Sequence, residues 1–278
     1  MLAVTAANLM HNALTKPTEA LVGEDGELLY VSTFAAFNDD WDLFRGPQSA
    51  QIVAEQLEIA VGVPQTAAWS ATGPRFADFD ATVTAVAYDG PLDNAFGLVF
   101  HVENRKEDDC TLPAVLLCGI SELAPLVGAA LRQALDQRQA TSYRAFMISS
   151  DGYYSLWQTE AGATTALSAW IASPHITQGI GAENTIRIRA RGSSYQFFIN
   201  GSAVQLCIPD DRTTASTYAG GECIDGSLQD TFHDDRSRTG RLGMIAQSTA
   251  TGGGGLVVRF DDMIVYSPAE SGSEDVRL

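Results

Sequence analysis

Several residues of this sequence have the side chains with which proteins recognise sugars. Aromatic rings pack against the apolar faces of sugar rings, and polar or charged side chains bind the surrounding hydroxyl groups. Tyr153 and Trp157 have the same parity within one predicted strand, so they would line one face together. Alternatively, Trp157 lies in the core between two sheets. The candidate ligand-binding residues are Trp69, His101, Glu103, Arg144, Tyr153, Trp157 and Trp170.

His101 and Glu103 stand two residues apart, a spacing that puts both side chains on one face of a strand. Such a pair could perform acid–base chemistry, with Glu103 as the acid and His101 tuning it. The simpler interpretation is a polar patch at a strand end. Serine-nucleophile motifs, phosphate-binding loops and dinucleotide fingerprints are absent from the sequence.

Arg187, Arg189 and Arg191 alternate with apolar residues, so they share one face of a predicted strand. Three guanidinium groups in a row could bind an anion. The alternative is a solvated outer face on which the arginines pair with the abundant acidic residues.

The chain of 278 residues contains 34 acidic and 17 basic residues, which gives a formal charge of −17. This charge argues against a nucleic acid or an anionic membrane as the main partner, because both would repel it. No run of about 18 apolar residues is present, so we expect no transmembrane segment. The first residues also lack the pattern of a signal peptide, which suggests that a leader or anchor is missing from this chain.

The four cysteines form two pairs that are local in the sequence, and their spacing does not match that of a Cys-x-x-Cys zinc site. We therefore expect two disulfides, Cys110–Cys118 and Cys207–Cys223, with free thiols as the alternative. Disulfides favour an oxidising compartment, so the predicted location is extracellular or at the cell surface.

Short alternating segments with turn signals between them predict an all-β protein. Asp89-Gly90, Asp151-Gly152 and Asn200-Gly201 are dipeptides that favour tight hairpins. The predicted strands cover residues 28–31, 56–63, 79–88, 95–102, 143–149, 153–159, 185–191, 195–199, 241–247 and 256–266. About ten short strands at this close spacing favour an antiparallel sandwich.

Four segments do not fit the strand pattern. Residues 1–27 are expected to form an N-terminal arm with a weakly helical start, and residues 269–278 a disordered tail. Within the sandwich domain of residues 28–268, residues 107–141 are predicted to be a helical insertion. Residues 207–238 are rich in Asp, Thr, Ser and Gly and are therefore predicted to be a long loop.

Five segments in order resemble one family of domains. Residues 93–100, Asp-Asn-Ala-Phe-Gly-Leu-Val-Phe, and residues 143–154 are similar to a strand and a hairpin of bacterial laminin-G-like or concanavalin A-like domains. Residues 170–176, 189–201 and 240–265 extend the resemblance, which covers residues 34–267. These domains, found in surface proteins of Chloroflexi and cyanobacteria, are relatives of family-16 glycoside-hydrolase-like domains, most of which lack demonstrated catalysis. The resemblance implies a concanavalin-like jelly-roll sandwich, here with a short helical arm and one helical insertion.

The resemblance also implies a structural calcium ion, which many jelly-roll domains hold between the first strand and an acid in the last one. The expected ligands are Asp39 and Asp262, with Asp40 and Asp261 as their neighbouring alternatives. By alternation, Asp262 would share the face of Phe260, where a carboxylate is costly unless it is paired or bound to a metal.

The predicted function is a non-catalytic extracellular binding module, with carbohydrate as the expected ligand. Family-16 enzymes carry the triplet Glu-x-Asp-x-Glu on one strand, and this triplet is missing, which weighs against an enzyme. Two alternatives stay open. One is a glycoside hydrolase of the same fold, and the other is a cell-surface assembly protein that forms oligomers or contacts another surface protein through its insertions.

Overall fold

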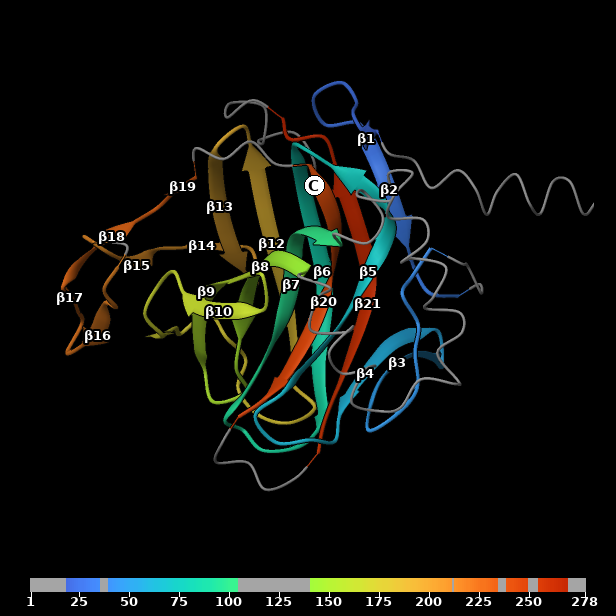
Figure 1. The fold of residues 1–278 in the computed structure, drawn as a ribbon, viewed down its shortest axis with the longest axis horizontal. Helices are drawn as coiled ribbons and strands as arrows, with labels where there is room; N and C mark the ends of the chain where they lie inside the picture. Colours follow the sequence, from blue (N-terminus) through green and yellow to red (C-terminus); the bar gives the residue numbers. More distant parts are fainter. Residues whose placement is uncertain are drawn as a thin grey trace, which may run out of the picture.

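The computed structural model describes residues 19–35, 40–104, 141–211, 213–234, 239–249 and 255–269. These residues form strands and turns without a helix, and most of them belong to two large sheets packed face to face (Figure 1). The central ladders of both sheets are antiparallel. This arrangement confirms the predicted all-β sandwich.

The two sheets interleave strands from distant parts of the sequence. In spatial order, the first sheet contains β1 (Ala20–Leu21), β5 (Ala67–Phe76), β20 (Gly240–Ser248), β7 (Asn94–Asn104), β8 (Thr141–Ile148), β9 (Tyr153–Glu160) and β10 (Ala163–Ala166), and β11 (Ile171–Ala172) also pairs with β9. The second sheet contains β14 (Ser202–Val204), β13 (Ser194–Ile199), β12 (Glu183–Arg191), β6 (Phe79–Asp89), β21 (Leu256–Tyr266), β4 (Gln56–Val61) and β3 (Gln48–Val53). Here β2 (Leu28–Ser32) pairs with β21, and β19 (Phe232–His233) pairs with β13.

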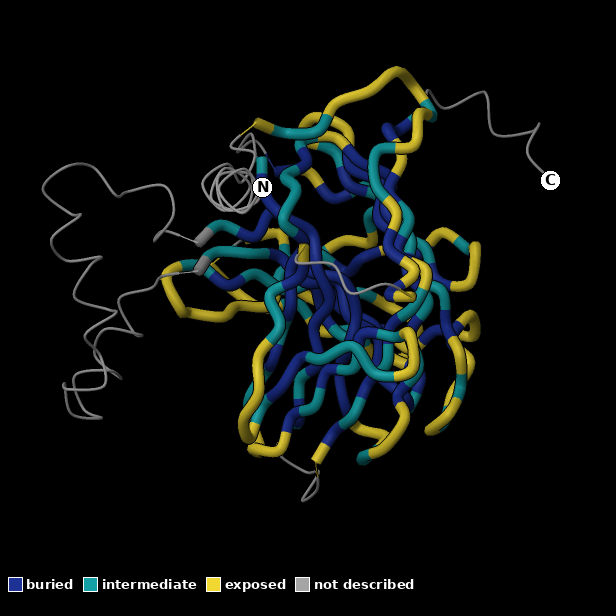
Figure 2. Tube along the Cα trace, turned by 90° about the vertical axis from the view of Figure 1, so that its right-hand side faces the viewer, coloured by how far each residue is buried: buried dark blue, intermediate teal, exposed yellow. Residues whose placement is uncertain are grey.

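The main core lies between the two sheets, where every second residue of a strand points inward. Leu57, Ile59 and Val61 of β4 are all buried, as their alternation predicts. Phe146 of β8 and Phe197 of β13 bring the sheets together, with ring centroids 4.7 Å apart. The buried interior between the sheets is visible in Figure 2.

A β-bulge in β7 changes which side chains face this core. The register of β7 with β8 shifts between Phe100 and Glu103, and His101 adopts a φ of +53°. Phe100 and His101 therefore both point inward, toward Tyr195 of the second sheet. Gly240 on β20 permits this close approach, because a Cβ there would lie 2.5 Å from the Cα of His101.

A second bulge, in β21, corrects the expected position of Asp262. Phe260 and Met263 are both buried, so Asp261 and Asp262 lie between two inward-facing residues. Asp262 has a φ of +49° and is exposed. The expectation that Asp262 shares the face of Phe260 is therefore wrong, because the additional residue of the bulge turns Asp262 to solvent.

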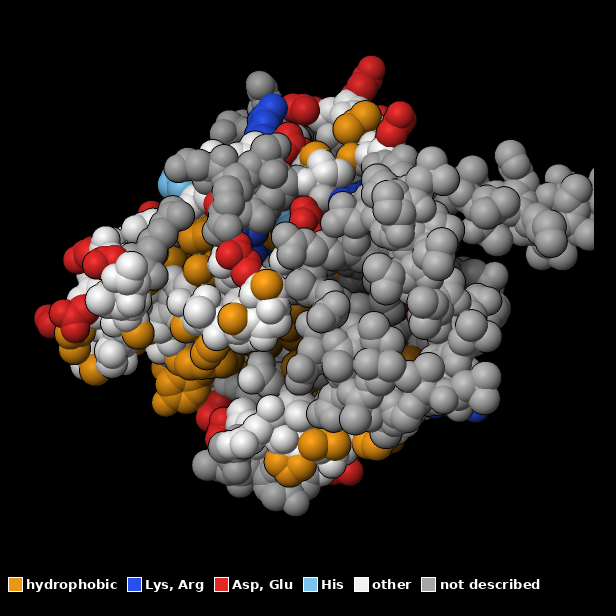
Figure 3. Space-filling view, in the orientation of Figure 1, with side chains coloured by type: hydrophobic (Ala, Val, Ile, Leu, Met, Phe, Trp, Pro, Cys, Tyr) orange, Lys and Arg blue, Asp and Glu red, His pale blue; other side chains and the backbone are white. Residues whose placement is uncertain are grey.

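Residues 206–229 form a projecting arm, which we call the β15–β18 arm, where the sequence predicted a loop. β15 (Leu206–Pro209) pairs with β18 (Gly226–Gln229), and β16 (Thr217–Ala219) pairs with β17 (Glu222–Ile224). The predicted disulfide Cys207–Cys223 is present and ties β15 to β17. Tyr218 packs against the core, whereas acidic side chains gather on the outside of the arm (Figure 3). The loop prediction failed because polar residues occupy the exposed sides of these short strands.

The Asp89-Gly90 dipeptide does not close a hairpin. It joins β6 of the second sheet to β7 of the first, so the chain crosses from one layer to the other. Asp151-Gly152 and Asn200-Gly201, in contrast, connect directly paired strands as predicted.

The described part of the N-terminal arm contains strand β1 and no helix. Several predicted segments lie outside the described residues. They are the helix near residues 3–14, the insertion except for Thr141, the Cys110–Cys118 pair and most of the tail. Among the described residues, no helix is long and apolar enough to cross a membrane.

Candidate functional site

The first sheet carries a second apolar cluster on the side that points away from the main core, which we call the outward face. The cluster consists of Ala71, Ala95, Val99, Val102, Ala145, Met147 and Ile245. Trp69, Trp157 and Trp170 pack against it, so the structure brings together three predicted ligand-binding residues from distant parts of the sequence. The alternative position of Trp157 in the core between the sheets is wrong.

Tyr143 also borders the outward face, although the sequence analysis did not select it. Its ring lies 6.0 Å from that of Trp69, and the rings of Trp157 and Trp170 are 6.3 Å apart. Burial raises the pKa of the Tyr143 phenol, which therefore stays protonated at neutral pH. The signal for Tyr143 was its parity, which is opposite to that of the inward-facing Phe146.

A cleft of about 220 Å³ opens at one end of the outward face, and we call it the rim cleft. It lies where β7 begins and where the turn of residues 149–152 joins β8 to β9. The cleft combines two carboxylates, two aromatic rings and three neutral polar side chains. Its lining residues are Asp93, Asn94, Ser149, Asp151, Tyr153, Trp170 and Thr249.

Hydrogen bonds fix the polar walls of the rim cleft. The Asn94 side chain donates to the Pro91 carbonyl at 2.6 Å and to Ser150 Oγ at 3.0 Å, and its Oδ1 accepts from the Ser150 amide at 3.0 Å. These bonds tie the start of β7 to the β8–β9 turn. Ser149 Oγ donates to Asp151 Oδ1 and accepts from the Tyr153 amide. The Asp151 carboxylate is thus held in one orientation.

The aromatic side of the rim cleft consists of one exposed ring and one partly buried ring. Tyr153 is 42% exposed, and Trp170 is partly buried against the outward face. Tyr153 points outward because its neighbour Tyr154 points into the core and donates its hydroxyl to the Gln205 carbonyl. Rings beside fixed hydrogen-bond acceptors are the combination that a sugar ring requires. Sequence analysis found Tyr153 and Trp170 but did not select Asp93, Asn94 and Asp151. It placed Asp93 and Asn94 in a strand-like segment and Asp151 in a hairpin turn.

Two predicted site residues lie elsewhere on β7. His101 is buried in the main core, where its Nε2 atom lies 3.0 Å from the Tyr195 hydroxyl. Glu103 stands opposite Ser142 of β8, near the end of β7 that is remote from Asn94. Neither lines the rim cleft. The bulge that turns His101 inward could not be foreseen from alternation.

Arg144 points inward, because it has the same parity on β8 as Phe146 and Ile148. It forms an ion pair with Asp234 and donates to the Gln158 side chain at 3.2 Å. This cluster lines a separate cleft of about 180 Å³ between β9, β10 and the β15–β18 arm. Arg144 is therefore not a neighbour of Tyr153 in the rim cleft.

The described part of the chain contains only one of the two predicted calcium ligands. Asp39 lies outside the described residues, and Asp262 is on an exposed bulge. Within the described ranges, no group of three or more His, Cys, Asp and Glu residues is arranged to hold a metal ion. Calcium binding by Asp39 and Asp262 stays a prediction.

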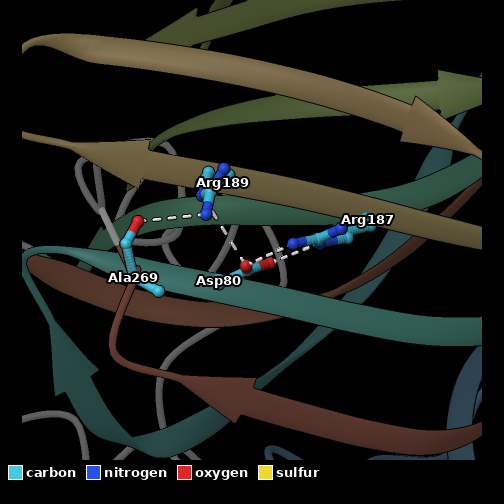
Figure 4. A network of polar contacts seen from close by, with 4 residues as sticks. All are labelled: Asp80, Arg187, Arg189 and Ala269. Atoms are coloured by element: carbon cyan, nitrogen blue, oxygen red, sulfur yellow. Dashed lines mark hydrogen bonds and ion pairs between the residues drawn. The ribbon is translucent and has the colours of Figure 1, made fainter. Parts of the chain in front are cut away.

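The three arginines of β12 pair with acidic residues on the outer side of the second sheet. Arg187 donates to both oxygens of Asp80 at 2.6 Å, and Arg189 lies 3.8 Å from the same carboxylate. Arg189 also donates to the Ala269 carbonyl at 3.0 Å (Figure 4). Arg191 lies 3.6 Å from Asp25. These contacts support the paired outer face over an anion-binding stripe.

No protein-family model and no curated protein matches this chain. Among solved structures, it is similar to a Bacillus subtilis protein of unknown function with a galectin-like fold, at 12% identity and a TM-score of 0.52, over 88% of this chain and 97% of that chain. It is also similar to a prokaryotic β-1,3-1,4-glucanase (lichenase) derived from a mouse hindgut metagenome, at 8% identity and a TM-score of 0.50, over 86% and 98% of the two chains. The carbohydrate-binding module CBM66 of Bacillus subtilis has 11% identity and a TM-score of 0.48, over 82% and 96%. The first two likenesses show the fold, and the chain is a concanavalin-like and galectin-like β-sandwich.

Proposed function

We propose that the protein is an extracellular carbohydrate-binding module that holds a glycan in the rim cleft without cleaving it. The rim cleft supports this proposal because it places the exposed ring of Tyr153 and the partly buried Trp170 beside fixed polar acceptors. Binding sites for small polar ligands commonly combine a concave apolar surface with a few oriented polar groups. The lichenase with the same fold acts on β-1,3-1,4-glucans, so these glucans are the first ligands to test.

The absence of catalysis is part of the proposal. Hydrolysis of a glycosidic bond generally requires two carboxyl groups on either side of the bond, one acting as an acid. The sequence lacks the Glu-x-Asp-x-Glu triplet, and the predicted acid Glu103 lies away from the rim cleft. The Cys207–Cys223 disulfide supports an extracellular location, because disulfides persist in oxidising compartments.

The test is a glycan array followed by calorimetry on each glycan that binds. We expect Tyr153→Ala to weaken binding about tenfold or more, because the ring supplies the apolar platform. Tyr266→Ala is the matched control, since Tyr266 is 39% exposed on the second sheet. An array without any binding, or equal affinity of the wild type and Tyr153→Ala, would refute the proposed site. Release of reducing ends from a bound glucan would favour the glycoside-hydrolase alternative.

A further inference from the structure

The rim cleft is acidic as well as aromatic. Asp93 and Asp151 contribute two carboxylates to it, and its described lining contains no lysine or arginine. A ligand that enters this cleft therefore meets the Asp151 carboxylate close to the aromatic rings. The overall charge of −17 reinforces this local field.

The Asp151 carboxylate is prepared to accept a further hydrogen bond. Ser149 Oγ donates to Asp151 Oδ1, and no described donor is bound to Oδ2. Ser149 is itself held by the Tyr153 amide and is 4% exposed. An acceptor that is already oriented loses little conformational entropy when a ligand donates to it.

The aromatic rings favour the same ligand charge as the carboxylates. The face of a tyrosine or tryptophan ring attracts a cation within about 6 Å of its centre. Tyr153 is exposed in the rim cleft and Trp170 lines its wall. A protonated amine in the cleft would be stabilised by both the rings and Asp151, whereas a carboxylate or sulfate would be repelled by both.

We propose that the rim cleft selects sugars by charge, binding amino sugars most tightly, neutral sugars next and anionic sugars least. This inference rests on the proposed function, because it assigns a ligand class to the same cleft. Asp151 is the specificity-determining residue, and it acts by accepting a hydrogen bond from the ammonium or hydroxyl group of the sugar.

The test compares the affinities of three hexasaccharides that share a β-1,4-linked backbone and differ in charge. They are the hexamers of glucosamine, glucose and glucuronic acid, measured by calorimetry at pH 6 and low salt. We expect the glucosamine hexamer to bind about tenfold more tightly than the glucuronic acid hexamer, a ratio that one charge-assisted hydrogen bond can supply. Added salt should reduce this ratio, because it screens partly exposed charges.

Asp151→Asn should reduce the ratio to about twofold, while keeping the turn, which asparagine also suits. Asp225→Asn is the matched control, because it removes the same charge from an exposed position between β17 and β18 of the β15–β18 arm. Thermal melting checks that both variants are folded. A ratio that Asp151→Asn leaves unchanged, or equal binding of the charged hexamers, overturns the charge selection. If array glycans bind and the glucosamine hexamer does not, only this inference fails; if no glycan binds at all, the proposed function fails.

Discussion

Arg144 and Asp234 form an ion pair that joins the first sheet to the segment after β19. Both side chains are 2% exposed. Removing one partner of such a pair leaves a buried charge without its counter-ion, which typically costs about 3–5 kcal/mol. The pair therefore contributes to the sandwich itself and is separate from the rim cleft.

We expect Asp234→Asn to lower the free energy of unfolding by about 3 kcal/mol, measured by urea denaturation. Glycan binding at the rim cleft should stay within about twofold of the wild type in the folded protein. The double variant Arg144→Met with Asp234→Leu should be more stable than Asp234→Asn, because it removes both charges together. Loss of glycan binding at full stability would instead place Arg144 in the ligand site, as the sequence first suggested.

The parity of a residue within its strand predicted much of the candidate site. Tyr153 and Trp157 share parity, and the structure places both on the outward side of β9. Arg144 could have been assigned correctly, since it alternates with Phe146 and Ile148 on the inward side. The position of Asp151 could not be predicted in this way, because parity does not apply to a residue in a turn. The cleft that Asp151 lines also forms between segments that are distant in the sequence.

The alternation of apolar and polar residues predicted most of the long strands but neither the short strands of the arm nor the bulges. Most of the long strands were predicted within a few residues of their ends, because each buries one complete face. β5 and β3 were not predicted. β5 contains Gly73-Pro74, a dipeptide that usually marks a turn. The short strands of the β15–β18 arm bury few side chains, so their sequence resembles a loop. A bulge inserts one residue and reverses parity beyond it, which explains the wrong expectation for Asp262.

The bulge at His101 depends on the absence of a side chain at Gly240. We expect Gly240→Ala to lower the free energy of unfolding by about 2–3 kcal/mol, because its Cβ would meet the backbone of β7. Gly255→Ala is the matched control, since the nearest atom to its Cβ would be 3.7 Å away. Chemical denaturation of both variants gives the comparison. Equal stability of the two would show that β7 can move away from β20 at little cost.

Strands β7 and β8 are neighbours in the first sheet but are separated in the sequence by residues 105–140. Asn104 and Thr141 are direct partners in the antiparallel ladder, so their strands are already in place for a hairpin. Asn-Gly is the dipeptide that best closes a two-residue hairpin. The sandwich and the rim cleft therefore have a backbone path that needs no residue from 105–140.

We expect a chain with residues 105–140 replaced by Asn-Gly to keep its β-sheet circular dichroism and a cooperative thermal transition. Glycan binding should also persist, because the rim cleft lies at the Asn94 end of β7, about 30 Å from Asn104 at the rise of an extended strand. Failure to fold would show that the sandwich depends on the removed residues. An increase in the fluorescence of an apolar dye would show that the removed residues help to bury the cluster around Val99 and Met147. Unchanged glycan binding in the same variant would support the proposed site at the rim cleft over one on the outward face.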